Sequence, residues 1–145
     1  IISFINKMKK AEKGKLIFGS AGFGLKNYGF SSLNKRSHIS TYLKNIYNLG
    51  FRHIDTAPSY GFSDRIIGNY HKVNNRKFCV WTKVDSLDLN SHFTVDKIYD
   101  SAKKSLANNN VECFECLYLH QNDIKIIEDK FVLKGLQNLK SCGIT

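Results

Sequence analysis

The chain has 145 residues, the length of one domain, with 42% hydrophobic and 23% charged residues and a single proline. This composition is typical of a globular domain and excludes a low-complexity chain. The formal net charge of +10 favours anionic partners such as a phosphorylated cofactor. However, Lys and Arg are scattered, and no basic block or RNA-type aromatic motif occurs, so we expect a solvated basic surface and no nucleic-acid partner.

Short apolar runs alternate with amphipathic stretches, which is the pattern of β/α units around a parallel sheet. The predicted strands are four apolar runs, at 16–19, 51–55, 78–83 and 115–120. A glycine-rich loop is expected over 20–24. Ile39, Leu43 and Ile46 recur at helical spacing before Gly50, which predicts a helix that ends there.

Three further helices are expected after the later strands. Ser63 is expected to cap a short helix that ends near Gly68, and Thr94 is expected to cap a longer one. The longer helix has an apolar face and is broken at 108–110. That face comprises Ile98, Ala102 and Leu106. A last helix is expected over 124–140, with Gly143 as its stop. Its apolar face comprises Ile127, Phe131, Leu136 and Leu139.

Polar residues close three of the predicted strands. They are Asp55, Lys83 and His120, and Tyr60 lies in the turn that follows Asp55. Because the carboxyl ends of parallel strands meet at one edge of a sheet, we expect these four side chains to gather there. An acid, a phenol, an amine and an imidazole at one place form a proton-transfer set.

The chemistry of such a set follows from the phenol. A free tyrosine has a pKa of about 10 and is a poor acid at neutral pH. A nearby ammonium stabilises the phenolate, and a carboxylate holds the ammonium charged and oriented. The phenol can then protonate a carbonyl oxygen while hydride arrives at the carbon, and an imidazole can orient the carbonyl.

Other candidate features have ordinary interpretations. The four cysteines include one C-x-x-C, Cys113 to Cys116, which is a weak signal for metal or redox chemistry. Cys79 and Cys116 are expected to pack as small hydrophobes within strands, and Trp81 is expected to be a core residue. No His, Cys, Asp or Glu cluster has metal-ligand spacing, so we predict no metal site. Because the cysteines are interpreted as free thiols, we expect a reduced, cytoplasmic protein. The spacing of the loop glycines does not fit G-x-G-x-x-G, so a Rossmann fingerprint is rejected.

The run over 50–61, Gly-Phe-Arg-His-Ile-Asp-Thr-Ala-Pro-Ser-Tyr-Gly, closely resembles the aldo-keto reductase signature G-[FY]-R-x-[IL]-D-T-A-x-x-Y-G. Residues 81–84 are similar to the family's lysine strand, and 117–120 are similar to its histidine strand. The opening run at 16–24 is similar to the family's first strand and loop. The resemblance extends from about residue 14 to residue 143.

This resemblance implies a (β/α)8 TIM barrel, of which residues 14–145 cover about the first four β/α units. It implies NAD(P)H-dependent interconversion of an alcohol and a small carbonyl compound (an aldehyde, ketone or sugar), with NADP(H) favoured over NAD(H). By the resemblance, Tyr60 is the general acid/base, Lys83 and Asp55 tune it, and His120 positions the substrate. Ala21, Gly22 and Asp55 are the cofactor-side positions that carry over.

Two positions depart from many relatives. Ser20 replaces the usual threonine, and Gln121-Asn122-Asp123 follows His120 where Trp-Pro is common. We expect both departures to affect substrate and cofactor contacts. The first 13 residues are interpreted as an extension, and those before Met8 as an upstream remnant, because Met8 is the only methionine.

Three alternatives remain open at this point. The barrel could be a non-catalytic relative that keeps the cofactor as a regulatory ligand, because fold does not fix function. The chain could be an inactive truncated fragment. Four strands leave two unpaired edges, so it could also be a small open sheet or a half-barrel that pairs with itself.

Overall fold

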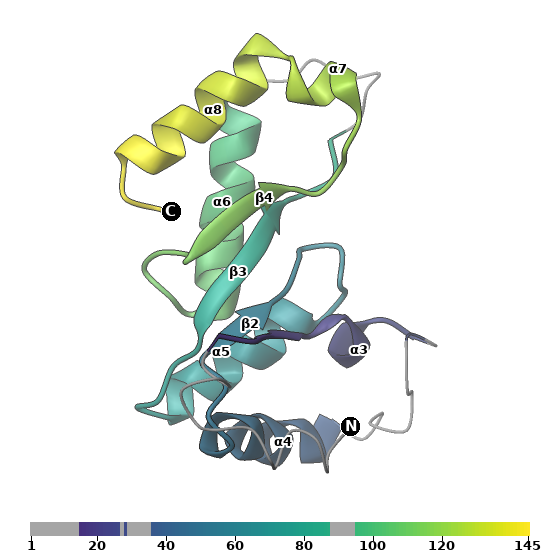
Figure 1. Ribbon diagram of the computed structural model, residues 1–145, viewed down its shortest axis with the longest axis vertical. Helices are drawn as coiled ribbons and strands as arrows, with labels where there is room; N and C mark the ends of the chain where they lie inside the picture. Colours follow the sequence, from purple (N-terminus) through teal and green to yellow (C-terminus); the bar gives the residue numbers. More distant parts are fainter. Residues whose placement is uncertain (1–14, 27, 29–35, 88–94) are drawn as a thin grey trace.

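The computed structural model of the chain describes residues 15–26, 28, 36–87 and 95–145. Its centre is one sheet of four parallel strands, which follow one another in chain order (Figure 1). The strands are β1 (Ile17–Gly19), β2 (His53–Asp55), β3 (Cys79–Val84) and β4 (Cys116–Leu119). All four predicted strands are therefore confirmed, with boundaries shifted by one or two residues.

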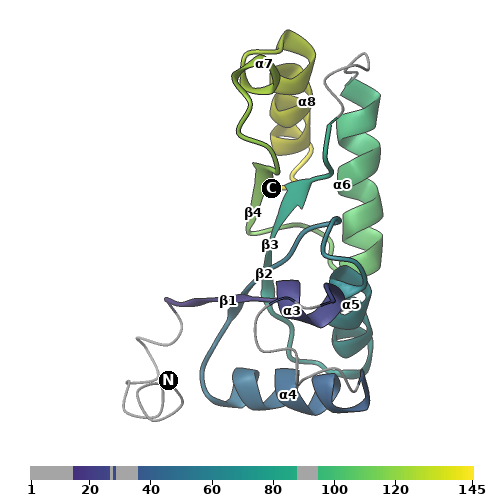
Figure 2. The same cartoon turned by 90° about the vertical axis from the view of Figure 1, so that its right-hand side faces the viewer.

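Helices connect the strands, as expected for parallel neighbours. They are α3 (Ala21–Gly24), α4 (Arg36–Asn48), α5 (Ser63–Val73), α6 (Val95–Asn109), α7 (Ile124–Ile127) and α8 (Lys130–Ser141). Figure 2 shows α5 and α6 together on one side of the sheet. An unbroken strand order with helices outside the sheet is the arrangement of a (β/α)8 barrel wall.

The two faces of the sheet differ in burial. Along β3, alternate side chains are buried against the helices. These are Val80, Thr82 and Val84. The intervening side chains are half-buried or exposed, on the face that no described helix covers. They are Cys79, Trp81 and Lys83. Lys83, the candidate functional residue of β3, therefore lies on the uncovered face.

The predicted apolar faces of α4 and α6 form much of the core. Their predicted core residues are all buried, at 9% exposure or less: Ile39, Leu43, Ile46, Ile98, Ala102 and Leu106. Burial of each Ile or Leu side chain in this set contributes roughly 1.5–3 kcal/mol. Gly50 and Gly143 have φ of 107° and 69°, which confirms them as left-handed stops after α4 and α8.

The last helix differs from the prediction. It is two helices, because the Asp129 carboxylate accepts hydrogen bonds from the backbone N–H groups of Phe131 and Val132 and starts α8 anew. The break rotates the apolar face, so that Ile127 and Phe131 are 41% and 47% exposed. The side that packs inward comprises Ile126, Val132, Gly135 and Leu139.

Helix α5 also differs, because it continues past Gly68 to Val73. Gly68 is not a stop: a Cβ there would overlap the carbonyl oxygen of Asn108, so glycine permits α5 to pack against the end of α6. Phe62 occupies the N-cap position, and the Ser63 hydroxyl makes other contacts, described below. Thr94, the predicted cap of α6, lies outside the described residues.

Three smaller expectations were wrong. The loop over 20–24 contains a helical turn, α3. Cys79 is exposed and Cys116 only half-buried, because both lie on the uncovered face or its margin rather than under the helices. Trp81 shares that face, so it is half-buried instead of part of the core.

Within the described residues, no helix combines the length and apolar character needed to cross a bilayer.

Candidate active site

An ion pair between β2 and β3 occupies the carboxyl edge of the sheet. Lys83 Nζ lies 2.8 and 3.0 Å from the two carboxylate oxygens of Asp55, and it also donates to the carbonyl oxygen of Thr56 at 3.0 Å. The Lys83 and Asp55 side chains are 17% and 30% exposed. These three contacts use the three donors of the ammonium group and hold Lys83 in one orientation. Its side chain nevertheless remains partly exposed.

Tyr60 and His120 complete the predicted set. The Tyr60 ring centroid lies 5.0 Å from Lys83 Nζ, and the His120 ring lies edge-on to Tyr60 with centroids 6.0 Å apart. The Ser59 hydroxyl lies 3.3 Å from His120 Nδ1. The structure thus brings all four predicted side chains to one end of the sheet, from β2, the turn after it, β3 and the residue after β4.

A buried polar network fixes the turn that carries Tyr60. The Ser20 hydroxyl donates to the carbonyl oxygen of Asp55 at 2.7 Å and lies 2.6 Å from the Ser63 hydroxyl. The Thr56 hydroxyl donates to Asp64 Oδ1 at 2.7 Å. Ser20, Thr56 and Ser63 are each 0% exposed. These contacts join the loop after β1, the end of β2 and the start of α5 into one unit.

Asp64 is the acidic residue of this network and was not identified from the sequence. It is 4% exposed, and burial raises the pKa of its carboxyl, while hydrogen bonds, first from Thr56, oppose the shift. The Ser105 hydroxyl donates to its other oxygen at 3.3 Å and links the network to α6. The signal available in the sequence was its place in the first turn of α5, where the helix dipole stabilises a carboxylate.

Two glycines also position Tyr60, and only one was singled out by the signature. A Cβ on Gly24 would overlap the carbonyl oxygen of Tyr60 and lie 2.7 Å from the backbone nitrogen of Phe62. Gly61 has φ of 60°, and a Cβ on it would lie 2.6 Å from the carbonyl oxygen of Gly24. The backbone of α3 therefore approaches the Tyr60 turn more closely than any larger residue would allow.

The departures from the family pattern have structural contacts here. The Ser20 hydroxyl belongs to the buried network just described. The Gln121 side chain forms two hydrogen bonds with the backbone of Leu87, at 2.6 and 2.8 Å, and so joins the segments after β3 and β4. Both residues therefore shape the edge of the site through other parts of the chain.

The three predicted cofactor-side residues lie at this edge but differ in exposure. The Asp55 carboxylate is partly exposed and Gly22 is exposed, whereas the Ala21 side chain is buried. Ala21 therefore offers a ligand its backbone at most. Gly22 lies in the helical turn that follows β1, and because it is exposed it leaves room for a ligand to approach its backbone.

Comparison with known proteins shows the family of this chain. The model of the Aldo/keto reductase family matches residues 15–144, which is nearly the whole chain. The chain belongs to the aldo/keto reductase family. Among curated protein sequences, none matches it.

Solved structures share the fold. A Pseudomonas aeruginosa protein assigned to the aldo-keto reductases is 25% identical, with a TM-score of 0.69 over 88% of this chain and 51% of that one. The glycerol dehydrogenase AKR11B4 from Gluconobacter oxydans is 26% identical, with a TM-score of 0.60 over 88% and 41%. Aldo-keto reductase AKR11C1 from Bacillus halodurans, at 19% identity and a TM-score of 0.67, covers 90% and 43% and shares the fold. The chain therefore spans about half the length of these (β/α)8 barrels.

Proposed function

We propose that the protein at its full natural length is an NAD(P)H-dependent oxidoreductase that interconverts a carbonyl compound and an alcohol. The observation that carries this proposal is the Asp55–Lys83 ion pair beside the Tyr60 ring. Next to a phenol that exchanges a proton, such a pair places a positive charge that can stabilise the phenolate. Residues 14–145 would form one half of the barrel that holds the site.

Each of the four side chains has a role in this proposal. The Tyr60 phenol donates a proton to the carbonyl oxygen, and the Lys83 ammonium stabilises the phenolate that forms. Asp55 keeps Lys83 charged and directed at the site through two short contacts. His120, edge-on to Tyr60, donates to or orients the same carbonyl oxygen.

The cofactor, when bound, supplies hydride to the carbonyl carbon, so that hydride and the Tyr60 proton together convert the carbonyl to an alcohol. The exposed edge at Gly22 and the partly exposed Asp55 carboxylate fit such a ligand. We propose NADP(H) rather than NAD(H), because the net charge of +10 favours the more anionic cofactor.

The substrate in this proposal is a small aldehyde, ketone or sugar. A glycerol dehydrogenase among the similar structures supports a small polyol or its carbonyl counterpart as a starting point. We also propose a cytoplasmic location, since all four cysteines are free and a reducing compartment keeps them so.

The test uses the full-length protein with NADPH or NADH and a panel of aldehydes, ketones and sugars. Absorbance reports oxidation of the reduced cofactor, and chromatography measures the alcohol. We expect carbonyl-dependent oxidation that yields one alcohol for each cofactor oxidised. Tight cofactor binding without turnover on any carbonyl would contradict the proposal and favour a regulatory relative.

A further inference from the structure

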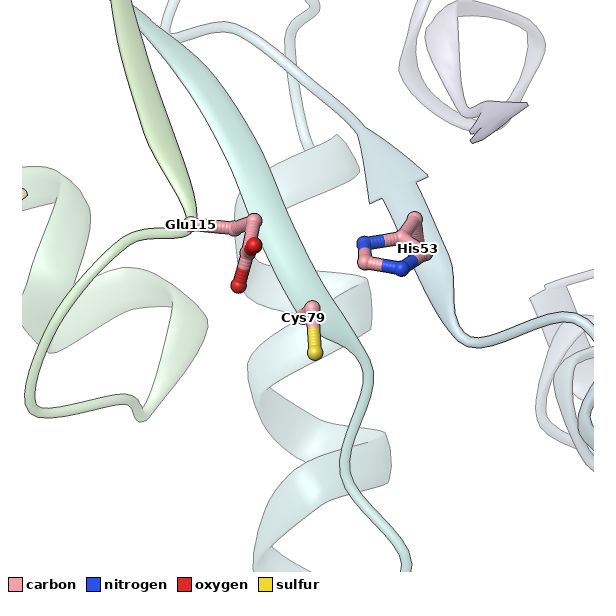
Figure 3. Close-up of side chains that lie close together, drawn as sticks. All are labelled: His53, Cys79 and Glu115. Carbon is pink, nitrogen blue, oxygen red and sulfur yellow. The ribbon is translucent and has the colours of Figure 1, made fainter. Parts of the chain in front are cut away.

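A second cluster of reactive side chains lies at the opposite end of the sheet from the ion pair. His53, Cys79 and Glu115 each direct one potential metal-ligand atom into the same space, and these atoms all lie within 4.8 Å of one another. Figure 3 shows His53 and Glu115 on either side of Cys79. His53 is half-buried, and Cys79 and Glu115 are exposed, so nothing in the described chain covers the cluster.

The strand register explains why these three residues meet. His53 and Cys79 are the first residues of β2 and β3 and are direct neighbours in the parallel pairing. Glu115 immediately precedes β4, and its N–H donates to the carbonyl oxygen of Val80 at 2.9 Å. Adjacent strands lie about 4.8 Å apart, so three consecutive strands bring their amino ends within reach of one ion.

We propose that His53, Cys79 and Glu115 form a zinc-type metal site at the amino ends of β2, β3 and β4. An imidazole nitrogen, a thiolate and a carboxylate are the three ligand types that Zn²⁺ takes, at about 2.0–2.3 Å. Tetrahedral coordination at these lengths needs ligand atoms roughly 3.3–3.7 Å apart. The ligand atoms now lie within 4.8 Å of one another, so a small rotation of the side chains brings them to this spacing, and a fourth position remains for water.

The location assigns the metal a structural role. The cluster lies at the amino ends of the strands, whereas Asp55 and Lys83 lie toward the carboxyl ends. In (β/α)8 barrels the carboxyl face carries catalysis and the amino face carries stability. A metal there would cross-link three neighbouring strands, so it would stabilise the fold without entering the proposed reaction. This inference does not depend on the proposed function.

Trp81 is hydrogen-bonded to His53, so its fluorescence can report metal binding at the site. Its Nε1–H donates to His53 Nδ1 at 3.1 Å, so in this state Nδ1 holds the lone pair and Nε2 carries the proton. A metal bound at Nδ1 displaces the tryptophan donor. A metal bound at Nε2 requires a proton on Nδ1, which also ends this hydrogen bond. Metal binding at His53 therefore changes the surroundings of the chain's single tryptophan.

The test titrates the tag-free, full-length protein with Zn²⁺ by calorimetry and with Co²⁺ by absorbance. We expect one metal per chain, a thiolate-to-cobalt charge-transfer band and a higher Tm with Zn²⁺. Cys79→Ser should remove the band, whereas Glu115→Gln should keep it. Both variants should weaken Zn²⁺ binding by at least about tenfold, because each loses one direct ligand. The fluorescence change on Zn²⁺ binding should be absent in Trp81→Phe.

Cys142→Ser is the matched control, because this cysteine is exposed, free and outside the cluster. It should bind Zn²⁺ and Co²⁺ like the wild type. Circular dichroism of each metal-free variant checks that it folds, and Cys79→Ser changes one atom at an exposed position. Equal Zn²⁺ affinity in Cys79→Ser and wild type would overturn the proposal, as would failure of the wild type to bind one metal. An equal loss in Cys142→Ser would show adventitious thiol binding only.

Discussion

Replacement of Gly24 by alanine should change the stability of the protein in opposite directions through helix propensity and through packing. Gly24 ends the helical turn α3, where alanine is favoured over glycine by up to about 1 kcal/mol. Against this, its Cβ would overlap the Tyr60 carbonyl oxygen and lie 2.7 and 2.9 Å from two backbone nitrogens. Backbone atoms cannot rotate away as a side chain can, so the turn must move. Such overpacking costs about 1–3 kcal/mol.

The control is Gly22→Ala in the same turn, where the new Cβ meets only the Tyr28 carbonyl oxygen at an ordinary 3.6 Å. We expect Gly24→Ala to lower the Tm of the full-length protein by roughly 2–5 °C. Gly22→Ala should leave the Tm unchanged or raise it by a few degrees. Differential scanning calorimetry measures both. If Gly24→Ala were as stable as Gly22→Ala, the close approach of α3 to the Tyr60 turn would be refuted.

The same substitution has a functional consequence. Because Gly24 touches the backbone of Tyr60, the required shift displaces the phenol relative to Lys83. A displacement of about 1 Å can reduce turnover roughly 100-fold. Steady-state kinetics at a temperature where the variant is fully folded should therefore show a fall in kcat. Unchanged kcat with a lowered Tm would mean that the turn recovers its position.

Two further predictions concern stability. Burial lowers the pKa of His71, whose Nε2 accepts the Phe78 N–H while Nδ1–H donates to the Asn109 carbonyl. The imidazole therefore takes up its second proton more readily in the unfolded chain than in the folded one. The free energy that neutral His71 contributes to folding should be fully present above the ordinary histidine pKa of about 6.5. Below that pH it should fall by up to about 1.4 kcal/mol per pH unit. Urea unfolding at several pH values should show a smaller slope in His71→Gln and the same slope in His38→Gln, the control at an exposed position. Loss of the α8 cap in Asp129→Ala should cost about 0.5–2 kcal/mol of unfolding free energy, whereas Asp129→Asn should retain most of it; equal urea midpoints for the two variants would contradict the capping role.

The elements that the sequence predicts best are those with local signals. Ile39, Leu43 and Ile46 mark α4 by their spacing alone, and Gly50 marks its end. The split of the last helix was missed because apolar residues continue through the break. The cap at Asp129 was a visible signal, but it competed with an unbroken helical pattern.

The site shows the same division. Asp55, Tyr60, Lys83 and His120 each lie at or just beyond a strand end, so their meeting follows from parallel pairing. The Asp64 network and the Gly24 contact depend on which loops pack together, and no local pattern encodes this. The His53, Cys79 and Glu115 cluster was likewise missed, because ligands from three separate strands have no motif spacing.

The most direct test of the account is the kcat/KM for carbonyl reduction by Tyr60→Phe in the full-length protein. Tyr99→Phe is the matched control, since this half-buried tyrosine on α6 also lies near a lysine, with its ring 5.2 Å from Lys103 Nζ. We predict that Tyr60→Phe lowers kcat/KM by about 10²- to 10⁴-fold with unchanged cofactor affinity, while Tyr99→Phe behaves like the wild type. Wild-type kcat/KM in Tyr60→Phe would contradict the assignment of Tyr60 as the proton donor.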